Sequence, residues 1–477
     1  KFARNNCCEK NMKKVLFVRA VDVISEVESR YPGLGLAYLA SSLKSHFGEN
    51  YFDFKIMERG NEVEVKKQIS SFKPDIVGIS SVTQNYNLAK NYAEYAQSQG
   101  IPVIIGGVHI SMLPESLSEY MDVACLGEGE KTIVELFELF IRKGGFPKEE
   151  LKNIKGIAYR EKGGVLIKTE ITPLIQKLDE IRRPSRDLLD IGKHSYIFSS
   201  RGCPYRCSFC ASSRFWNTVR LFSAEYVVKE IKELYEKYDV KVISFYDDLF
   251  IISPQRLADM TVLLKKEGLH GKIKFTCSCR SNLVNDNTVK LLKDMGVVSV
   301  GLGLESGCPR ILNYLKGEST SVEHNINAVK ILKEKGIAVN ASFVIGSPDE
   351  KESEMMETYD FIKKNRLDLV DIYVLMPLPG TPVWQYALDR NLVSKDMDWS
   401  KLNVNFEMNY KRSIVVSEIY TREQIYNFYK RFRRLRLYIN FKNIWRSPFL
   451  MDLPRYAFKI FYGKFIVLFK TLKSILK

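Results

Sequence analysis

Ser199-Ser-Arg-Gly-Cys-Pro-Tyr-Arg-Cys-Ser-Phe-Cys210 brings three cysteines, Cys203, Cys207 and Cys210, onto one short loop. Thiolates in this C-x3-C-x2-C spacing can hold an iron–sulfur cluster by three corners and leave the fourth iron open, whereas a structural site would normally close its coordination shell. A zinc site would need a fourth ligand at short spacing, and the nearest histidine, His194, precedes the loop. Three packed structural cysteines are the remaining alternative. Because these three are bunched in a chain with only nine cysteines, we predict a reactive cluster here.

Length and composition describe a chain of several domains. Its 477 residues are enough for two or three separate cores. The cysteines are odd in number and no secretory leader is visible, which predicts a reducing, cytoplasmic location. No apolar run is long enough to span a bilayer. The net charge is +16, and 13 basic residues with one acid fall between positions 430 and 477.

The first predicted domain, residues 1–142, alternates short apolar runs with helical patterns. Expected strands are 14–18, 52–57, 75–80, 102–107 and 122–127, and expected helices include 34–47 and 62–72. This alternation, with Gly and Pro between the elements, predicts an α/β fold with a doubly wound parallel sheet. Such sheets bind ligands beyond the carboxyl ends of their strands.

Glycines and hydroxyl side chains gather where three of these strands end. The candidate ligand-binding residues are Ser80, Ser81, Thr83, Gly106, Gly107, His109, Gly127, Glu128 and Gly129. Glycine lets the backbone approach a ligand closely, and hydroxyls and N–H groups at helix starts suit a polar tail or a phosphate. Ordinary turn chemistry is the alternative for these motifs, and a helix-capping or core role is the alternative for His109.

Residues 143–194 are expected to form a bridge. Within it, residues 156–168 predict a hairpin that turns at Gly163-Gly164, and residues 173–191 predict a polar linker with a short helix. The alternation then resumes over residues 195–400. Expected strands are 196–200, 241–247, 272–279, 298–304, 338–345 and 370–376, with helices such as 225–237, 287–295 and 321–335.

The cysteine triplet, with Phe209 just before its third cysteine, resembles the signature of the radical S-adenosylmethionine (SAM) superfamily. The six βα units resemble the partial (βα)6 TIM-type barrel of that family, in which chemistry gathers at the carboxyl ends of the strands. Tyr31-Pro-Gly-Leu-Gly-Leu-Ala-Tyr-Leu39, Lys73-Pro-Asp-Ile-Val-Gly-Ile-Ser80 and the glycine loops resemble the Rossmann-like cobalamin-binding domain that precedes the barrel in the class B methyltransferase-like subfamily. The bridge also resembles the join between those two domains.

One departure concerns the lower face of cobalamin. Domains that ligate cobalt from below carry Asp-x-His-x-x-Gly after the first strand, whereas this chain reads Ala20-Val-Asp-Val-Ile-Ser-Glu-Val. Bound cobalamin is therefore expected to lack a histidine ligand from that loop. The departure also leaves open a domain that has lost its cofactor.

The resemblance implies three cofactors, a [4Fe-4S] cluster, SAM and cobalamin, and it implies contacts at the strand ends. Asp247 and Asp248 would meet the SAM amino group, with capping of the next helix as the alternative. Arg280 would pair with the SAM carboxylate as a bidentate fork. Glu305, with Ser306 beside it, would accept hydrogen bonds from the ribose. Ile345-Gly346 would belong to the segment that cradles adenine.

Cys277 and Cys279 lie two apart on an expected strand and, with Cys308, suggest a second cluster. No fourth ligand or compact spacing supports that site, so we expect these three to be small buried residues, with a substrate-facing thiol as the alternative.

Residues 401–477 are predicted to be a basic, amphipathic helical region. Lys459, Lys470, Lys473 and Lys477 would share one side of a helix and aromatic and aliphatic residues would cover much of the rest. Such a helix suits an anionic membrane surface. Docking on the barrel is the alternative. RNA binding is the weakest option because no recognised module is visible.

We interpret the chain as a cobalamin-dependent radical SAM enzyme that methylates an unactivated carbon. In that class, one electron from the cluster cleaves SAM and cobalamin carries the methyl group, while the protein supplies geometry and excludes water. An electron donor such as flavodoxin or ferredoxin is implied. The sequence does not name the substrate, and a membrane-facing tail would favour a lipid or lipid-linked molecule.

The same sequence features allow three alternative functions to be compared. A radical SAM enzyme can cyclise or oxidise its substrate without methyl transfer. A membrane-attached cobalamin or iron–sulfur sensor is the non-enzymatic alternative. A tRNA methylthiotransferase would need three further N-terminal cysteines and a C-terminal β-barrel, which Cys7, Cys8, Cys125 and a helical tail do not match.

Overall fold

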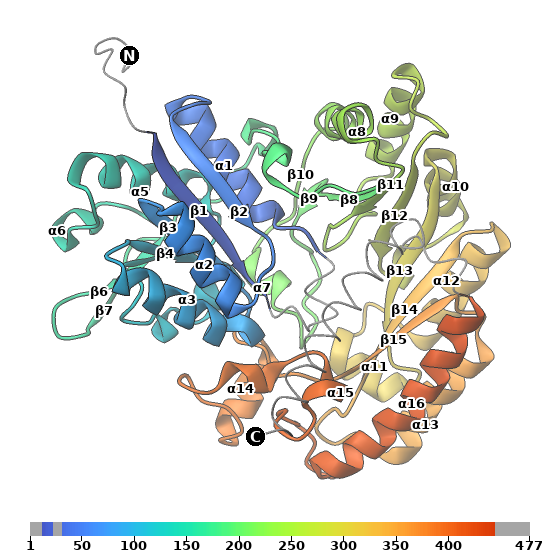
Figure 1. Ribbon diagram of the computed structural model, residues 1–477. Helices are drawn as coiled ribbons and strands as arrows, with labels where there is room; N and C mark the ends of the chain where they lie inside the picture. The colour runs from blue at the N-terminus through green and yellow to red at the C-terminus, as the bar shows by residue number, and fades with distance from the viewer. Residues whose placement is uncertain (1–11, 22–30, 444–477) are drawn as a thin grey trace, which may run out of the picture. The chain divides into compact units, whose positions relative to one another are not determined.

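The computed structural model describes residues 12–21 and 31–443, which divide into two compact units (Figure 1). The first holds most residues up to 189, and the second holds residues 176–180 and those from 190 onward. The expectations for Cys7, Cys8, most of the loop after the first strand and the basic stretch from residue 444 lie outside the described residues.

The first unit contains a seven-stranded sheet in the order β2-β1-β3-β4-β5-β6-β7. The strands are β1 (Lys13–Ala20), β2 (Phe52–Met57), β3 (Ile76–Ser81), β4 (Val103–Gly106), β5 (Val123–Cys125), β6 (Ile157–Arg160) and β7 (Leu166–Lys168). Strands β1 to β5 are parallel, which confirms the predicted doubly wound sheet. Its order changes direction between β1 and β3, the kind of point at which such sheets bind ligands.

Helices cover both faces of this sheet. They are α1 (Leu34–Phe47), α2 (Glu62–Phe72), α3 (Tyr86–Ser98), α4 (Val108–Met112), α5 (Gly129–Lys143) and α6 (Lys148–Leu151). α1 packs beside α5, and α2 packs beside α3. The start of α2 is fixed by Asn61, whose side chain accepts from Glu64 N–H while the Glu64 carboxylate accepts from Asn61 N–H.

The hairpin between residues 157 and 168 forms as expected, but it extends the first sheet. β6 pairs antiparallel with β5 through Cys125 and Ile157, and β7 pairs with β6. Ile157, Ala158 and Tyr159 are all buried, so the hairpin belongs to the core of this unit. A hairpin pattern is local, and the sequence does not say which sheet edge will accept it.

The second unit is built on six parallel strands in the order β15-β14-β13-β12-β11-β8. The strands are β8 (His194–Ile197), β11 (Val242–Phe245), β12 (Lys274–Cys279), β13 (Val297–Glu305), β14 (Ala338–Ile345) and β15 (Leu369–Val374). All six were expected from the sequence. The first ends earlier than expected, at Ile197, and residues 200–201 (β9) pair instead with Arg220–Leu221 (β10).

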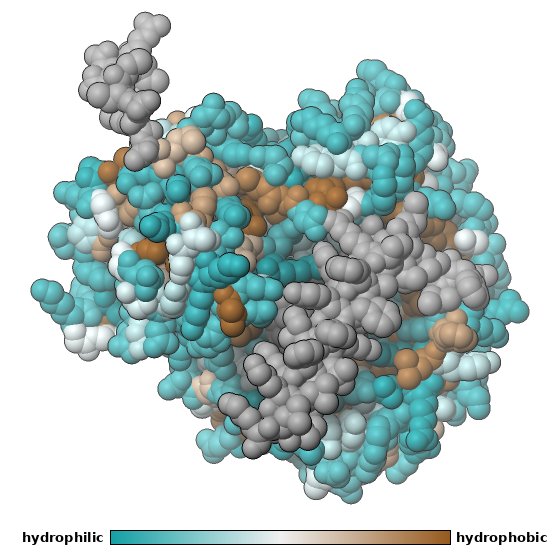
Figure 2. Space-filling model, viewed as in Figure 1, coloured by the Kyte–Doolittle hydropathy of each residue, from teal (hydrophilic) through white to brown (hydrophobic). Residues whose placement is uncertain are grey.

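Helices follow the strands of the second unit in order (Figure 1). They are α7 (Ser212–Phe215), α8 (Ala224–Tyr238), α9 (Pro254–Lys266), α10 (Asp286–Met295), α11 (Pro309–Lys316), α12 (Val322–Glu334), α13 (Glu352–Lys364), α14 (Pro382–Asp389), α15 (Phe406–Asn409) and α16 (Arg422–Lys442). The outer sides of α8 and α9 are mostly hydrophilic in Figure 2, as expected for helices whose apolar residues face the sheet, although Val262 of α9 is exposed.

α16 docks on the barrel against β15 and buries Ile425, Tyr429 and Phe432. Its Asn440 side chain accepts a hydrogen bond from Val370 N–H at 2.8 Å and donates one to Val370 C=O at 3.0 Å. β15 is an edge strand, so Asn440 satisfies main-chain groups that no further strand pairs. Within the described stretch, none of the helices combines the length and the apolar character needed to cross a bilayer.

Candidate active site

The cluster loop, which we define as Gly202–Cys210, follows β9 and ends just before α7. Its three cysteines are unbridged and half-buried. The loop starts with a sharp turn at Gly202, whose φ is +92°, and a Cβ there would lie 2.4 Å from the C=O of Thr218. Only glycine fits such a position. Phe209 is partly exposed on the same loop.

The cysteine sulfurs receive N–H donors from different sources. Burial raises the pKa of Cys203 to about 11 and also raises the pKa of Cys210. The N–H of Tyr205 opposes this change at Cys203, and the N–H groups of Ser212 and Ser213 oppose it at Cys210. Cys207 Sγ instead accepts from Arg280 Nη1 at 3.3 Å. Metal binding would therefore have to displace the thiol protons.

Three thiols on one short loop are a donor set that fits an iron–sulfur cluster. In the part of the chain that the structure describes, no three His, Cys, Asp or Glu side chains gather around one point where a metal ion could sit. In a [4Fe-4S] cluster each thiolate binds a different iron, so the ligands need not converge on one atom. Cys203, Cys207 and Cys210 would hold the cluster.

The two acids after β11 behave differently. Asp247 is buried, and its carboxylate accepts from Ser199 N–H at 2.7 Å, from the Ser199 hydroxyl and from Ser200 N–H at 3.1 Å. Burial raises its pKa to about 6, against the opposing effect of these donors and of Arg256. Asp247 thus holds the segment that leads into the cluster loop. Asp248 is exposed, and its carboxylate accepts from the Ser212 side chain and from Gly202 N–H.

The ends of β12, β13 and α11 contribute a group of buried charged side chains. We define the charged group as Arg280, Glu305 and Lys316, which are 5%, 7% and 7% exposed. Burial raises the pKa of Glu305 while Lys316 and Arg280 oppose that change, and burial lowers the pKa of Lys316 while Glu305 opposes it. Sequence reasoning named Arg280 and Glu305 but missed Lys316, because a lone lysine at a helix end usually faces solvent.

The turn after β13 is shaped around the Glu305 carboxylate. Glu305 has a φ of +62°, unusual for a residue with a side chain. A Cβ on Gly303 would lie 2.3 Å from Glu305 Oε1, so glycine leaves the room that this carboxylate occupies. Ser306 is fully buried and turns away, since its hydroxyl contacts the Thr358 hydroxyl at 3.0 Å and accepts from Cys308 N–H.

The predicted adenine segment is held by a carboxylate that the sequence analysis did not single out. Ile345 is buried at the end of β14, and the N–H groups of Gly346 and Ser347 both donate to Glu350 Oε2, at 2.7 and 2.9 Å. Glu350 Oε1 is buried without a hydrogen-bond partner among the described residues. Burial raises the pKa of Glu350 to about 7.

This raised pKa predicts a pH-dependent cost. Between about pH 4.5 and 7 the folded chain holds a proton on Glu350 that the unfolded chain has lost, so its contribution to the free energy of unfolding is full below pH 4.5 and falls as pH rises towards 7. Glu350→Gln removes the titration. The free energy of unfolding of Glu350→Gln, relative to that of wild type, should therefore rise by up to about 3 kcal/mol between pH 4.5 and pH 8. Urea unfolding of cluster-free protein measures this difference. The exposed Glu357→Gln is the control, and a pH-independent difference would contradict the expectation.

The predicted ligand residues of the first unit lie at the carboxyl ends of β3, β4 and β5. Gly107 has a φ of +104°, and a Cβ there would lie 2.5 Å from Ser81 C=O, so the loops after β3 and β4 abut. Gly127 has open space around its missing side chain. Ser80, Ser81, Thr83 and Gly106 complete an edge of small side chains that fits close approach of a large flat ligand.

Three of the predicted residues there have structural contacts instead. Glu128 is buried and accepts from Ile175 N–H at 2.8 Å, and Gly129 faces Leu39 of α1. His109 is fully buried. Its ring centroid lies 4.1 Å from that of Tyr86 with the two planes tilted, and the Thr83 and Ser116 hydroxyls lie at its two ring nitrogens. Burial lowers its pKa to about 3, so the ring is neutral. These contacts favour the core-histidine alternative.

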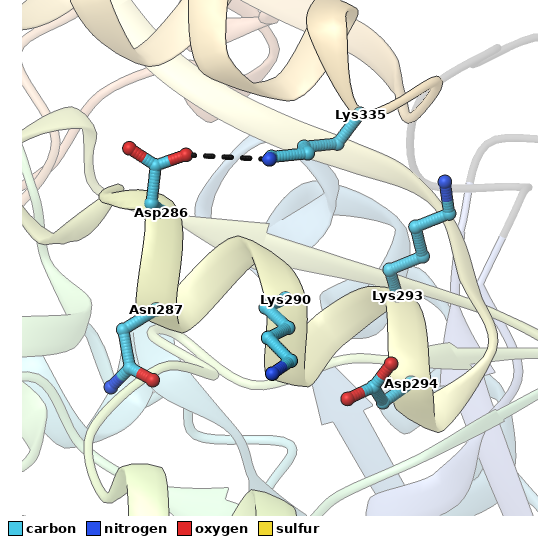
Figure 3. A pocket seen from close by; sticks show the side chains of 6 residues that line it. All are labelled: Asp286, Asn287, Lys290, Lys293, Asp294 and Lys335. Carbon is cyan, nitrogen blue, oxygen red and sulfur yellow. Dashed lines mark ion pairs between the residues drawn. The ribbon is translucent and has the colours of Figure 1, made fainter.

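A hollow of about 270 Å³ lies outside this site. It is lined by residues of α10 and by Lys335 at the end of α12, and Figure 3 shows Lys335 Nζ reaching Asp286 Oδ1 at 3.6 Å. All its lining residues on α10 are charged or amide side chains on the exposed side of the helix. None of them is a strand-end residue, so the hollow belongs to the outer surface.

Cys277, Cys279 and Cys308 are small buried side chains. Cys277 and Cys279 are buried on one face of β12 with their sulfurs 3.8 Å apart, as their spacing predicted. Cys308 is buried at the start of α11 and donates towards Glu354 at 3.7 Å. These contacts agree with the expectation of small buried residues.

A doubly wound sheet followed by a partial barrel with a three-cysteine loop defines a two-cofactor class of enzymes. The chain matches the Radical SAM superfamily over residues 197–362 and the B12 binding domain over residues 20–137. It is 37% identical to the uncharacterized methyltransferase PH0819 of Pyrococcus horikoshii, over 78% of this chain and 81% of that protein. The protein belongs to the radical SAM family whose members carry a B12 binding domain.

Other relatives show how varied this family is. The anaerobic magnesium-protoporphyrin IX monomethyl ester cyclase of Rubrivivax gelatinosus is 28% identical over 80% of this chain and 70% of its own length. Among solved structures, the radical SAM methyltransferase TsrM of Kitasatospora setae matches 79% of this chain and 76% of its own with a TM-score of 0.64 and 17% identity. The cobalamin-dependent enzyme OxsB matches 89% and 62% with a TM-score of 0.63 and 21% identity.

The similarity to solved structures supports the fold, and the two family matches support the cofactors. The predicted fold class, the enzyme interpretation and the three cofactors are confirmed at the level of the family.

Proposed function

We propose that this protein methylates an unactivated carbon of its substrate in a reaction that needs the cluster, SAM and cobalamin. The observation that carries the proposal is the cluster loop beside the charged group at the carboxyl end of a barrel sheet, in a chain that also has a B12 binding domain. The 37% identity to a protein named a methyltransferase supports methyl transfer. When bound, these cofactors supply SAM cleavage and the methyl group.

The residues of the chain would provide binding and positioning. Cys203, Cys207 and Cys210 would hold the cluster, and Asp248 would receive the SAM ammonium. Glu305 would accept hydrogen bonds from the ribose, and the segment at Gly346 that Glu350 holds would meet adenine. Ser80, Ser81, Thr83 and Gly107 would line the approach of cobalamin. Because His109 is committed to core contacts, it would not ligate cobalt.

Anaerobic purification with added cobalamin tests this proposal. An absorbance spectrum should show retained corrin, an iron assay should show a loaded cluster, and SAM with a deuterated methyl group should yield 5′-deoxyadenosine and a labelled product. Corrin and 5′-deoxyadenosine without any labelled product would favour cyclisation or oxidation, the alternative that the cyclase relative supports. Retained cofactors with no 5′-deoxyadenosine would favour the sensor.

We also propose that the end of α16 contacts an anionic membrane surface. Leu437, Tyr438 and Phe441 are exposed at helical spacing, with exposed fractions of 46%, 65% and 80%. Arg434 and Lys442 lie exposed around them. An apolar stripe between cations is typical of helices that lie in the headgroup region, and it supports a lipid or lipid-linked substrate.

Vesicle sedimentation of the whole chain tests the membrane contact. Binding to vesicles of phosphatidylglycerol and phosphatidylcholine should exceed binding to phosphatidylcholine alone, and Leu437→Ser with Phe441→Ser should lower it about tenfold. Ile171→Ser, which changes an apolar side chain exposed elsewhere, is the matched control. Equal binding to both vesicle types, or no effect of the double substitution, would overturn the proposal.

A further inference from the structure

The guanidinium of Arg280 is committed to the protein on nearly every side. Nη2 donates to Lys316 C=O at 3.0 Å and to the Ser319 hydroxyl at 2.7 Å, and Nη1 donates to Cys207 Sγ at 3.3 Å. One face of the plane lies 3.9 Å from the centroid of the Tyr205 ring, and the Tyr205 hydroxyl accepts from Asn282. Arg280 therefore ties the cluster loop to the ends of β12 and α11.

These contacts leave no fork for a carboxylate. A bidentate pair uses either Nη1 with Nη2 or Nε with Nη2, and both edges need an Nη2 hydrogen. Both Nη2 hydrogens already have acceptors in the protein. The bidentate SAM contact expected of Arg280 from the sequence would require breaking one of them.

The bond to Cys207 differs in kind from the donors to the other two cysteines. Cys203 and Cys210 receive main-chain N–H groups from the cluster loop and the residues just after it, whereas Cys207 receives a charged side chain from another strand end. Hydrogen bonds to cluster sulfurs and nearby positive charge both favour the more negative, reduced cluster. A cation that donates directly to a ligand sulfur does both.

On Arg280, Nε is buried without a hydrogen-bond partner among the described residues, but Nε alone cannot form a fork. Lys316 has more donors to offer. Among the described residues its ammonium makes one hydrogen bond, to Gly303 C=O. An ammonium has three donors, so capacity for an anionic ligand remains. The end of α11 that carries Lys316 also contacts the cluster loop, because Ser208 N–H in the loop donates to Leu315 C=O at 2.9 Å.

We propose that Arg280 is a positioning residue that holds the cluster loop and raises the reduction potential of the cluster through Cys207, and that Lys316 rather than Arg280 receives the SAM carboxylate. This rests on the proposed cluster site. Reduction of the cluster takes one electron from the donor and moves no proton and no bond, so the potential reports the Arg280 contact directly.

Two measurements on the anaerobically reconstituted chain separate the two roles. One is the midpoint potential of the cluster, followed by electron paramagnetic resonance during dithionite titration, and the other is the Kd for SAM. Arg280→Met should lower the midpoint potential of the cluster. At the wild-type midpoint the ratio of reduced to oxidised cluster should fall about tenfold, which corresponds to about 59 mV for one electron. Its Kd for SAM should change less than threefold. Lys316→Met should weaken SAM binding at least tenfold with the smaller shift in potential.

Graded and control variants keep the test decisive. Ser319→Ala removes one acceptor of Arg280 Nη2, so it should lower the midpoint potential by a smaller amount. This variant replaces Arg280→Met in the test if Arg280→Met fails to load iron. Arg422→Met, an exposed arginine on α16, should change neither value. Loss of SAM binding in Arg280→Met at an unchanged potential would overturn the inference, as would no change in either. Both readouts need only a loaded cluster, so they stand apart from the corrin and methylation results.

Discussion

Replacing Cys207 with serine is expected to abolish cluster loading and SAM cleavage. Serine is a poor ligand for iron, and with two cysteines left the loop cannot hold three corners of a cluster. The substitution also removes the sulfur that accepts from Arg280. Iron content should fall from about four atoms per chain to below one, and 5′-deoxyadenosine formation should fall by at least about 1,000-fold. The same is expected for Cys203→Ser and Cys210→Ser.

A cysteine outside the loop provides the matched control. Cys308 is buried at the start of α11 and points towards Glu354, a contact that a serine hydroxyl can keep. Cys308→Ser should therefore load iron and cleave SAM as wild type does. If Cys308→Ser lost its iron while Cys207→Ser kept it, the assignment of the cluster to the loop would be wrong.

Asp247→Ala is expected to have the largest effect on folding of the substitutions considered. The carboxylate accepts two main-chain N–H groups and one hydroxyl, and its charge opposes the lowering of the pKa of the buried Arg256, which itself donates to Ser199 C=O. Removing it leaves these donors unpaired and a buried cation without its counter-charge. A loss of about 3–5 kcal/mol in the free energy of unfolding of the second unit follows.

Companion variants separate this role from SAM binding. Ser199→Ala removes one hydroxyl donor and should cost only about 1 kcal/mol. Asp247→Asn keeps the shape of the side chain but places an amide group near N–H and hydroxyl donors. Its loss of unfolding free energy should lie between those of Ser199→Ala and Asp247→Ala. Urea unfolding followed by circular dichroism measures all three. A loss of SAM binding in Asp247→Ala with less than about 1 kcal/mol of destabilisation would instead assign Asp247 to the SAM ammonium.

The sequence was most informative where the pattern is local. The strand at 338–345 and the helices at 34–47 and 62–72 have the bounds that the apolar periodicity predicts. The strand ends follow from these elements, and so does the position of Cys203, Cys207 and Cys210 near the end of the first barrel strand.

What the sequence could not give depends on contacts between distant segments. Asp247 and Asp248 look alike in sequence, and only the fold shows that Ser199, 48 positions earlier, turns its N–H towards Asp247. Arg280 looks like a free guanidinium at a strand end, but its acceptors come from residues 207, 316 and 319. Glu350 carries no motif of its own, and it acts through two amides of the preceding turn.

Asn440 has a consequence for any shortened form of this protein. The sheet of the second unit is not closed on itself, so β15 would present a bare row of main-chain groups to other chains. The single amide of Asn440 imitates one residue of a neighbouring strand at Val370, and α16 shields the rest. A chain cut before residue 422 would uncover a template for intermolecular strand addition, and self-association would then precede any loss of chemistry.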